Sequence, residues 1–184
     1  MIAAILKETT AGENRVSATP QTVKELIKSG LTVRVQTGAG DASHYPDQDY
    51  QNAGAEICVD AAATSDNAHI ILKVASPTIE EMDLIPNGAA FVSLFQTTRE
   101  IKQVKALTNK NITGFSMHLI PRTTLAQSMD ALSSQANIAG YKSVLIGAAH
   151  LPVYMPLLMT AAGTIPPAKV MILGAGVAGL QAIA

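Results

Sequence analysis

Cysteine, tryptophan and aromatic residues are scarce in this chain. Its 184 residues include one cysteine and no tryptophan, and aromatic residues make up 4%. One cysteine excludes a disulfide within the chain and fits a reducing compartment, so we expect Cys58 to be a small core residue. With so few aromatic rings, a surface that stacks nucleic-acid bases is not expected. No metal site is predicted, because no metal-ligand spacing links the four histidines, which are His44, His69, His118 and His150.

Charged residues and long apolar runs are also few. Charged residues make up 15% of the chain and the formal net charge is −1, so neither nucleic acid nor an anionic lipid surface is an expected partner. No stretch approaches the roughly 18 uninterrupted apolar residues of a membrane span. The apolar run in MIAAILKETT is too short for a signal peptide and lacks a basic leading region. We therefore expect a soluble, cytoplasmic chain.

Short apolar runs alternate with helical patterns over the first 115 residues. The predicted strands are 2–6, 31–35, 56–59, 70–74, 89–94 and 112–115, and the predicted helices are 20–29, 46–53 and 99–108. In SPTIEE, Pro77 suits a first helical position, and Thr78 and Glu81 have the spacing of a capping box. This alternation predicts an α/β fold with a doubly wound parallel sheet and helices on both faces.

The composition changes in the last third of the chain. A long helix is predicted from Ala131 to Ala149, and its small residues suit close packing against another helix or subunit. A segment interrupted by prolines follows, and then a predicted strand from Val170 to Leu173. We therefore divide the chain into an α/β domain (1–125), a connecting segment (126–165) and the start of a Rossmann domain (166–184).

The glycine turn GAGVAG matches the pattern G-x-G-x-x-G, with Gly174, Gly176 and Gly179 as its glycines and Val177 and Ala178 between them. The first glycine permits a tight turn, the second lets a pyrophosphate approach, and the third allows close packing of strand and helix. Amides at the following helix start favour phosphate charge. Because the turn joins a predicted strand to a helix-forming segment, we predict dinucleotide binding rather than a plain turn.

A second polar group lies in PRTTLAQSMDALSSQ, just before the long helix. Arg122, Gln127, Asp130 and Ser133 fall within twelve positions. An arginine, an amide and a carboxylate on one loop can orient a carboxamide through directed hydrogen bonds. The alternative is a capped helix start, with Ser128 or Asp130 as the N-cap and Arg122 in solvent.

A third group follows the first strand, in KETTAGENRVSATP. Lys7, Glu8, Glu13 and Arg15 are expected at the carboxyl end of that strand, where open α/β sheets place their sites. Lys73 ends a later strand and should reach the same edge. These cations could bind a carboxylate, or all of these residues could form structural ion pairs.

Taken together, ETTAGENRVSATP, IPRTTLAQSMDALSSQANIAGYKSVL and TAAGTIPPAKVMILGAGVAGLQAIA resemble the NAD(H)-binding component of the alpha subunit of proton-translocating NAD(P) transhydrogenase. They are similar, more loosely, to alanine dehydrogenase. The resemblance implies NAD(H) as the cofactor. It places the nicotinamide end at Arg122, Thr123, Thr124, Gln127, Asp130 and Ser133, and the pyrophosphate at Gly174, Gly176, Val177, Ala178 and Gly179.

The resemblance also implies a reaction and partners. Hydride would pass directly from NADH to NADP+ on an NADP(H)-binding component, so no catalytic side chain is expected. A membrane-spanning component would couple the reaction to proton movement and hold this chain at the membrane surface. A homodimer is expected too.

The two relatives can be separated at one position. Arg15 and Lys73 match substrate-binding residues of alanine dehydrogenases, but Gln96 stands where those enzymes carry a catalytic histidine. Glutamine cannot act as a general acid or base. An alanine-dehydrogenase-like oxidoreductase and a non-catalytic dimerisation scaffold remain the alternatives.

The resemblance carries an expectation about length as well. Members of the family continue after the glycine turn through a complete nucleotide-binding domain, including an acidic residue about 20 positions further on. We therefore expect the 184 residues to be a fragment that binds NADH weakly by itself.

Overall fold

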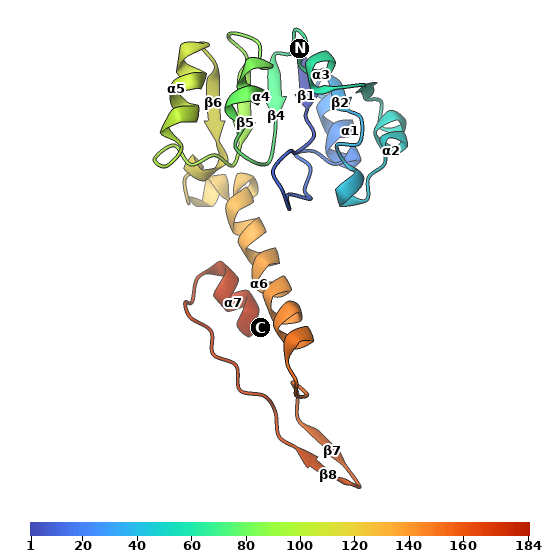
Figure 1. The fold of residues 1–184 in the computed structure, drawn as a ribbon, viewed down its shortest axis with the longest axis vertical. Helices are drawn as coiled ribbons and strands as arrows, with labels where there is room; N and C mark the ends of the chain where they lie inside the picture. The colour runs from blue at the N-terminus through green and yellow to red at the C-terminus, as the bar shows by residue number, and fades with distance from the viewer. The chain divides into compact units, whose positions relative to one another are not determined.

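The computed structural model describes residues 1–184, which divide into two compact units, Met1–Ile120 and Pro121–Ala184. The first unit is an α/β sheet domain, and the second contains a long helix, a hairpin and a short final helix (Figure 1). No helix in the chain combines the length and apolar character needed to cross a membrane.

A six-stranded, fully parallel sheet forms the centre of the first unit, with the strand order β3-β2-β1-β4-β5-β6. The strands are β1 (Ile2–Ile5), β2 (Thr32–Gln36), β3 (Glu56–Cys58), β4 (Ile70–Leu72), β5 (Ala90–Ser93) and β6 (Thr113–Ser116). The direction of strand addition reverses between β1 and β4, as in a doubly wound sheet. The predicted fold class is thereby confirmed.

Helices connect successive strands: α1 (Pro20–Lys28), α2 (Asp47–Asn52), α3 (Ala61–Ser65), α4 (Ile79–Asp83) and α5 (Ile101–Asn109), with 3₁₀ turns at Asp41–Ser43 and Met117–Leu119. The capping box of Thr78 and Glu81 is confirmed at the start of α4. Pro77 precedes the N-cap, so its predicted place inside the helix was wrong. The sequence patterns missed α3, a short helix whose N-cap is Asp60.

Alternate residues of β1 serve two separate cores. Ala3 and Ile5 pack in one cluster with Val23 of α1 and Tyr50 of α2. Ala4 belongs to the other cluster, which contains Met82 of α4, Phe91 of β5 and Leu107 of α5. Successive side chains of a strand point to opposite faces, so both faces of the sheet are covered. Cys58 is buried at the end of β3, as predicted.

The second unit begins with a 3₁₀ helix, Thr124–Met129, followed by the long helix α6 (Ala131–His150), which confirms the helix predicted there. An antiparallel hairpin of β7 (Leu158–Thr160) and β8 (Gly163–Ile165) comes next, and α7 (Val177–Ile183) ends the chain. The strand predicted over Val170–Leu173 does not form. Strands are defined by ladder hydrogen bonds, and this segment has no neighbouring strand to supply them.

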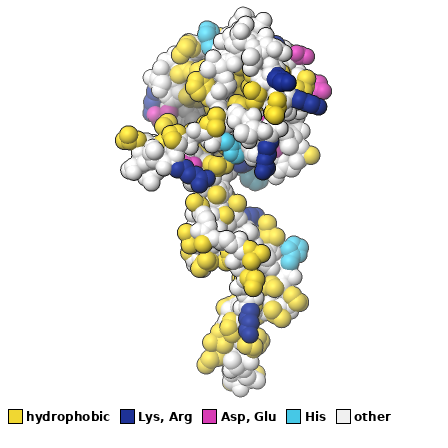
Figure 2. All heavy atoms as spheres, turned by 90° about the vertical axis from the view of Figure 1, so that its left-hand side faces the viewer, with side chains coloured by type: hydrophobic (Ala, Val, Ile, Leu, Met, Phe, Trp, Pro, Cys, Tyr) yellow, Lys and Arg dark blue, Asp and Glu magenta, His cyan; other side chains and the backbone are white.

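The two units differ in surface chemistry. Four charged residues occur in the second unit: Arg122, Asp130, Lys142 and Lys169. In Figure 2 the surface of this unit is accordingly dominated by hydrophobic and uncharged side chains. Many large apolar side chains of this unit are exposed, among them Ile138, Leu145, Met159, Met171 and Leu173. Pro121–Ala184 therefore presents apolar surface that has no partner within the unit.

Candidate functional site

The start of α6 is built around Asp130. Its Oδ1 accepts a hydrogen bond from the Ser133 backbone N–H at 2.9 Å, and its Oδ2 accepts one from Ser133 Oγ at 2.6 Å. These bonds from Ser133, together with the positive charge of Arg122, hold the pKa of Asp130 below its usual range. Asp130 is thus the N-cap of α6 and is kept as an anion beside a cation.

The loop before Asp130 displays polar side chains to solvent. Arg122, Thr123, Thr124 and Gln127 are all exposed, whereas Ala126 is buried and anchors the 3₁₀ helix. The Ala126 backbone N–H donates to the Thr123 carbonyl at 3.0 Å, which closes the first turn. The capped helix start predicted as an alternative is therefore present, and it leaves donors and one carboxylate available for an amide ligand.

The glycine turn before α7 needs each of its glycines for a different reason. Gly174 has φ +104°, a conformation that side chains disfavour. A Cβ at Gly179 would collide with the Gly174 carbonyl oxygen, so turn and helix are in direct backbone contact. Gly176 has an ordinary φ of −78°, and a Cβ there would meet no atom within 4 Å. Open space at this position fits a cradle that a phosphate group can approach.

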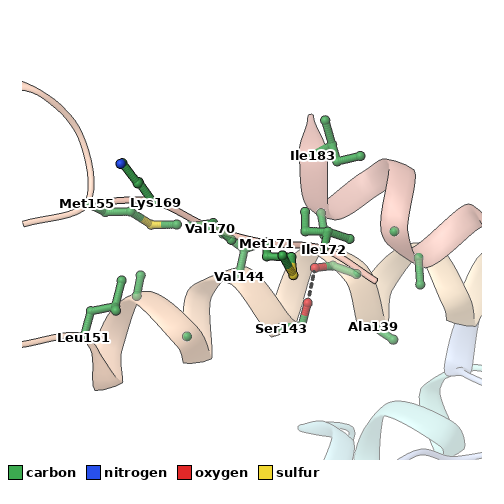
Figure 3. Close-up of a pocket in the computed structure, with 16 residues that line it drawn as sticks. Ala139, Ser143, Val144, Leu151, Met155, Lys169, Val170, Met171, Ile172 and Ile183 are labelled. Carbon is green, nitrogen blue, oxygen red and sulfur yellow. Dashed lines mark hydrogen bonds between the residues drawn. The ribbon is translucent and has the colours of Figure 1, made fainter. Parts of the chain in front are cut away.

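An apolar groove of about 970 Å³ lies between α6, the extended segment 169–172 and α7 (Figure 3). Val144 of α6 and Ile183 of α7 lie on its two sides, and Met171 and Ile172 also line it. Lys169 is the one charged residue of the lining. This surface suits the packing of apolar side chains rather than the binding of a charged ligand.

The third predicted group lies at the carboxyl edge of β1 and β4 and forms a buried ion cluster. Lys73 Nζ lies 2.6 Å from Glu81 Oε1 and 3.7 Å from Glu8 Oε2, and the side chain of Lys73 is 1% exposed. Glu8 also accepts the backbone N–H groups of Val74 and Ala75. The structure thus brings Glu8 and Lys73 together as predicted, and it supports the ion-pair interpretation for Lys73.

Burial and hydrogen bonding act in opposite directions on these two carboxyls. Burial raises the pKa of Glu8 and outweighs its bonds to Val74 and the charge of Lys73. Burial also acts to raise the pKa of Glu81, but hydrogen bonds from Lys73, the Thr78 backbone and Thr9 lower it below its usual value. Sequence reasoning assigned Glu81 only to the capping box and missed its contact with Lys73, which depends on the fold.

Glu13 and Arg15 form a pair beside this cluster. Arg15 Nη2 lies 2.6 Å from Glu13 Oε2, and this hydrogen bond lowers the pKa of Glu13. A small cavity of about 120 Å³ lies here and is lined by Lys7, Glu8, Glu13, Arg15, Gly38, Ala39, Asp41 and Ala42. Gln96 follows β5, at the same edge of the sheet as Lys73, and is partly buried.

Known proteins match the whole of this arrangement. Residues 4–139 fit the family described as alanine dehydrogenase/PNT, N-terminal domain, and residues 143–184 fit the corresponding C-terminal domain. The chain belongs to the alanine dehydrogenase/PNT family.

Relatives within the family include transhydrogenases and alanine dehydrogenases. The first part of the NAD(P) transhydrogenase alpha subunit of Rhodospirillum rubrum, which is a separate chain there, is 44% identical over 98% of this chain and 48% of its own length. Alanine dehydrogenase of Methanococcus maripaludis is 32% identical over 99% of this chain and 49% of its own length. The chain spans about half the length of these curated relatives.

Solved structures give the same result. The transhydrogenase from Sinorhizobium meliloti matches with a TM-score of 0.95 and 43% identity, over 100% of this chain and 55% of that one. An L-alanine dehydrogenase matches with a TM-score of 0.87 and 27% identity, over 100% of this chain and 51% of that one. These comparisons confirm the resemblance that the sequence motifs indicated.

Proposed function

We propose that this chain is the NAD(H)-binding part of a transhydrogenase, in which hydride passes from NADH to NADP+ held by a partner component. The observation that supports this most directly is the glycine turn, where Gly176 leaves open the space that a phosphate would take. The anionic N-cap Asp130, with Arg122 nearby, lies on the same unit and suits the carboxamide end of the cofactor.

Each group of residues has a role in this proposal. Arg122 and Gln127 donate hydrogen bonds to the carboxamide oxygen, and Asp130 accepts from the carboxamide N–H groups. Ser133 fixes the orientation of the Asp130 carboxylate. Backbone N–H groups of the glycine turn hold the pyrophosphate. When bound, NADH supplies the hydride, and the task of the chain is to align the cofactor and exclude water.

The proposal includes the setting of the reaction. An NADP(H)-binding component and a membrane-spanning component are the proposed partners. They couple hydride transfer to proton movement across the membrane, and the chain is held at the cytoplasmic side through them. The relatives named transhydrogenase subunit alpha support this assembly.

Substitutions in the loop before α6 test the function in the full-length gene product, assayed for hydride transfer with its partner components. Arg122→Ala and Asp130→Ala are each expected to lower the rate by about 10- to 100-fold, because each removes a charge-assisted hydrogen bond to the nicotinamide. Arg99→Ala and Asp83→Ala, at exposed positions of the first unit, serve as controls. A rate unchanged by both loop variants would favour a non-catalytic scaffold, and alanine-dependent NAD+ reduction would favour an alanine dehydrogenase.

Residues 1–184 alone are expected to bind NADH weakly. The segment Lys169–Leu173 next to the glycine turn has no neighbouring strands, and the adjacent groove is open and apolar. A turn without this support must be ordered on binding, which costs affinity. Isothermal titration calorimetry measures the effect, and a micromolar dissociation constant for NADH would contradict the expectation.

We also propose that the exposed apolar surface of α6 and the hairpin is used in a homodimer. Ile138, Tyr141, Leu145 and Ile146 are each about half exposed along α6. Ile146→Glu is expected to raise the dimer dissociation constant at least about tenfold, since an unpaired charge would be buried. Sedimentation velocity measures this, with Ile101→Glu on α5 as the control. A wild-type full-length protein that sediments as a monomer would contradict the proposal.

A further inference from the structure

Helices α6 and α7 meet with their backbones in direct contact at Gly140. This glycine is the buried residue of α6. A Cβ at Gly140 would collide with the carbonyl oxygen of Ala178, and it would lie 2.9 Å and 3.0 Å from the carbonyl carbon and Cα of the same residue. These are backbone atoms, so they cannot rotate aside as a side chain could. Any larger residue at position 140 must displace α7.

A hydrogen bond fixes the same contact at a second point. Asn137 Nδ2 donates to Gln181 Oε1 at 2.7 Å. Asn137 precedes Gly140 by three residues on α6, and Gln181 follows Ala178 by three residues on α7. Residues three apart lie on one face of a helix, so the two contacts together set both the distance and the rotation of α7 against α6.

The same two helices carry both halves of the proposed cofactor site. Ala178 is the second residue of α7, directly after the glycine turn. Ser133, which holds the Asp130 carboxylate, lies seven residues before Gly140 on α6, or about 10 Å along a helix axis. Both halves belong to the unit Pro121–Ala184. The contact at Gly140 is therefore where the glycine turn is fixed relative to the nicotinamide loop.

We infer that Gly140 is a positioning residue that sets the spacing between the glycine turn and the Asp130 loop, so that one dinucleotide reaches both. This inference rests on the proposed function. A ligand held at two points binds tightly only when the spacing of the two points matches its length. A displaced α7 would still meet each half of the cofactor separately, but not both halves at once.

Gly140→Ala tests the inference in the full-length gene product, and Gly147→Ala is its matched control. Both substitutions lie in α6 and gain the same helix propensity, but a Cβ at Gly147 meets no atom within 4 Å. Gly140→Ala is expected to raise the dissociation constant of NADH about tenfold or more, and to leave that of AMP within about twofold. AMP carries only one half of the dinucleotide and does not need the spacing. Gly147→Ala should change neither constant.

Asn137→Ala provides a second test that leaves the glycine in place. Its expected rise in the NADH dissociation constant is smaller, about two- to fivefold, since one neutral hydrogen bond is lost. The double variant Asn137→Ala with Gln181→Ala should bind NADH as the single variant does, because both remove the same bond. This pair decides the question if Gly140→Ala does not fold.

Three results would overturn the inference. Gly140→Ala could match Gly147→Ala in NADH affinity, or it could lose NADH and AMP equally, which would indicate a purely structural role. Asn137→Ala could leave NADH affinity unchanged. Failure of the proposed function looks different, because the wild-type protein would then not bind NADH, or Asp130→Ala would not weaken its binding.

Discussion

Replacing Lys73 with methionine is expected to lower the free energy of unfolding by about 3–5 kcal/mol. Glu8 and Glu81 would remain in a buried cluster without their cation. Methionine keeps most of the volume of the lysine side chain, so the loss reports charge rather than packing. Urea unfolding followed by circular dichroism measures it. Lys28→Met, which breaks an exposed ion pair with Glu25, should cost at most about 1 kcal/mol.

The loss should also depend on pH. Without Lys73 the pKa values of Glu8 and Glu81 in the folded state rise above their unfolded values. The folded variant then binds protons more readily than the unfolded chain, so its stability recovers as pH falls. The difference from wild type should be largest near pH 7 and shrink as pH approaches the ordinary glutamate pKa of about 4.3. A difference that is constant over this range, or one below about 1 kcal/mol, would contradict the buried-charge account.

Replacing Gly176 with alanine is expected to weaken NADH binding by about 100-fold in the full-length gene product and to leave thermal stability unchanged. A Cβ at this position meets no protein atom within 4 Å, and the backbone φ of −78° is ordinary for alanine. The methyl group would instead occupy the place of the pyrophosphate and prevent its bonds to backbone N–H groups, at a cost of about 1.5–3 kcal/mol.

Fluorescence titration with NADH and a thermal melt measure the two effects together. The contrast with Gly179→Ala is informative, because a Cβ at Gly179 would collide with the Gly174 carbonyl and should lower both stability and binding. If Gly176→Ala binds NADH as well as wild type does, the motif is a plain turn and the proposed function loses its main support.

The parallel sheet could be predicted because its strands carry their pattern locally. IILKV and AAFVSL are almost continuously apolar, which is typical of strands buried on both faces. Failures occurred where structure depends on neighbours or is very short. The Val170–Leu173 segment has a strand-like sequence but no adjacent strand, and α3 has too few residues for a helical period to appear.

The candidate site divides in the same way. The N-cap Asp130 and the glycine turn follow from spacing, because each acts within a few residues. The contact of Lys73 with Glu8 joins residues 65 positions apart, and only the adjacency of β1 and β4 creates it. Gly140 looks like any small residue of a long helix, and its role appears only once α7 lies against it.

The strand order has a consequence for how the chain is made on the ribosome. β2 and β4 each pair with β1, β3 pairs with β2, β5 with β4 and β6 with β5. Every strand therefore finds its partner among segments already synthesised, and no later strand has to insert between two paired ones. Since domains generally fold as units during synthesis, Met1–Ile120 can build its sheet outward from β1 while the apolar residues after Pro121 are still emerging.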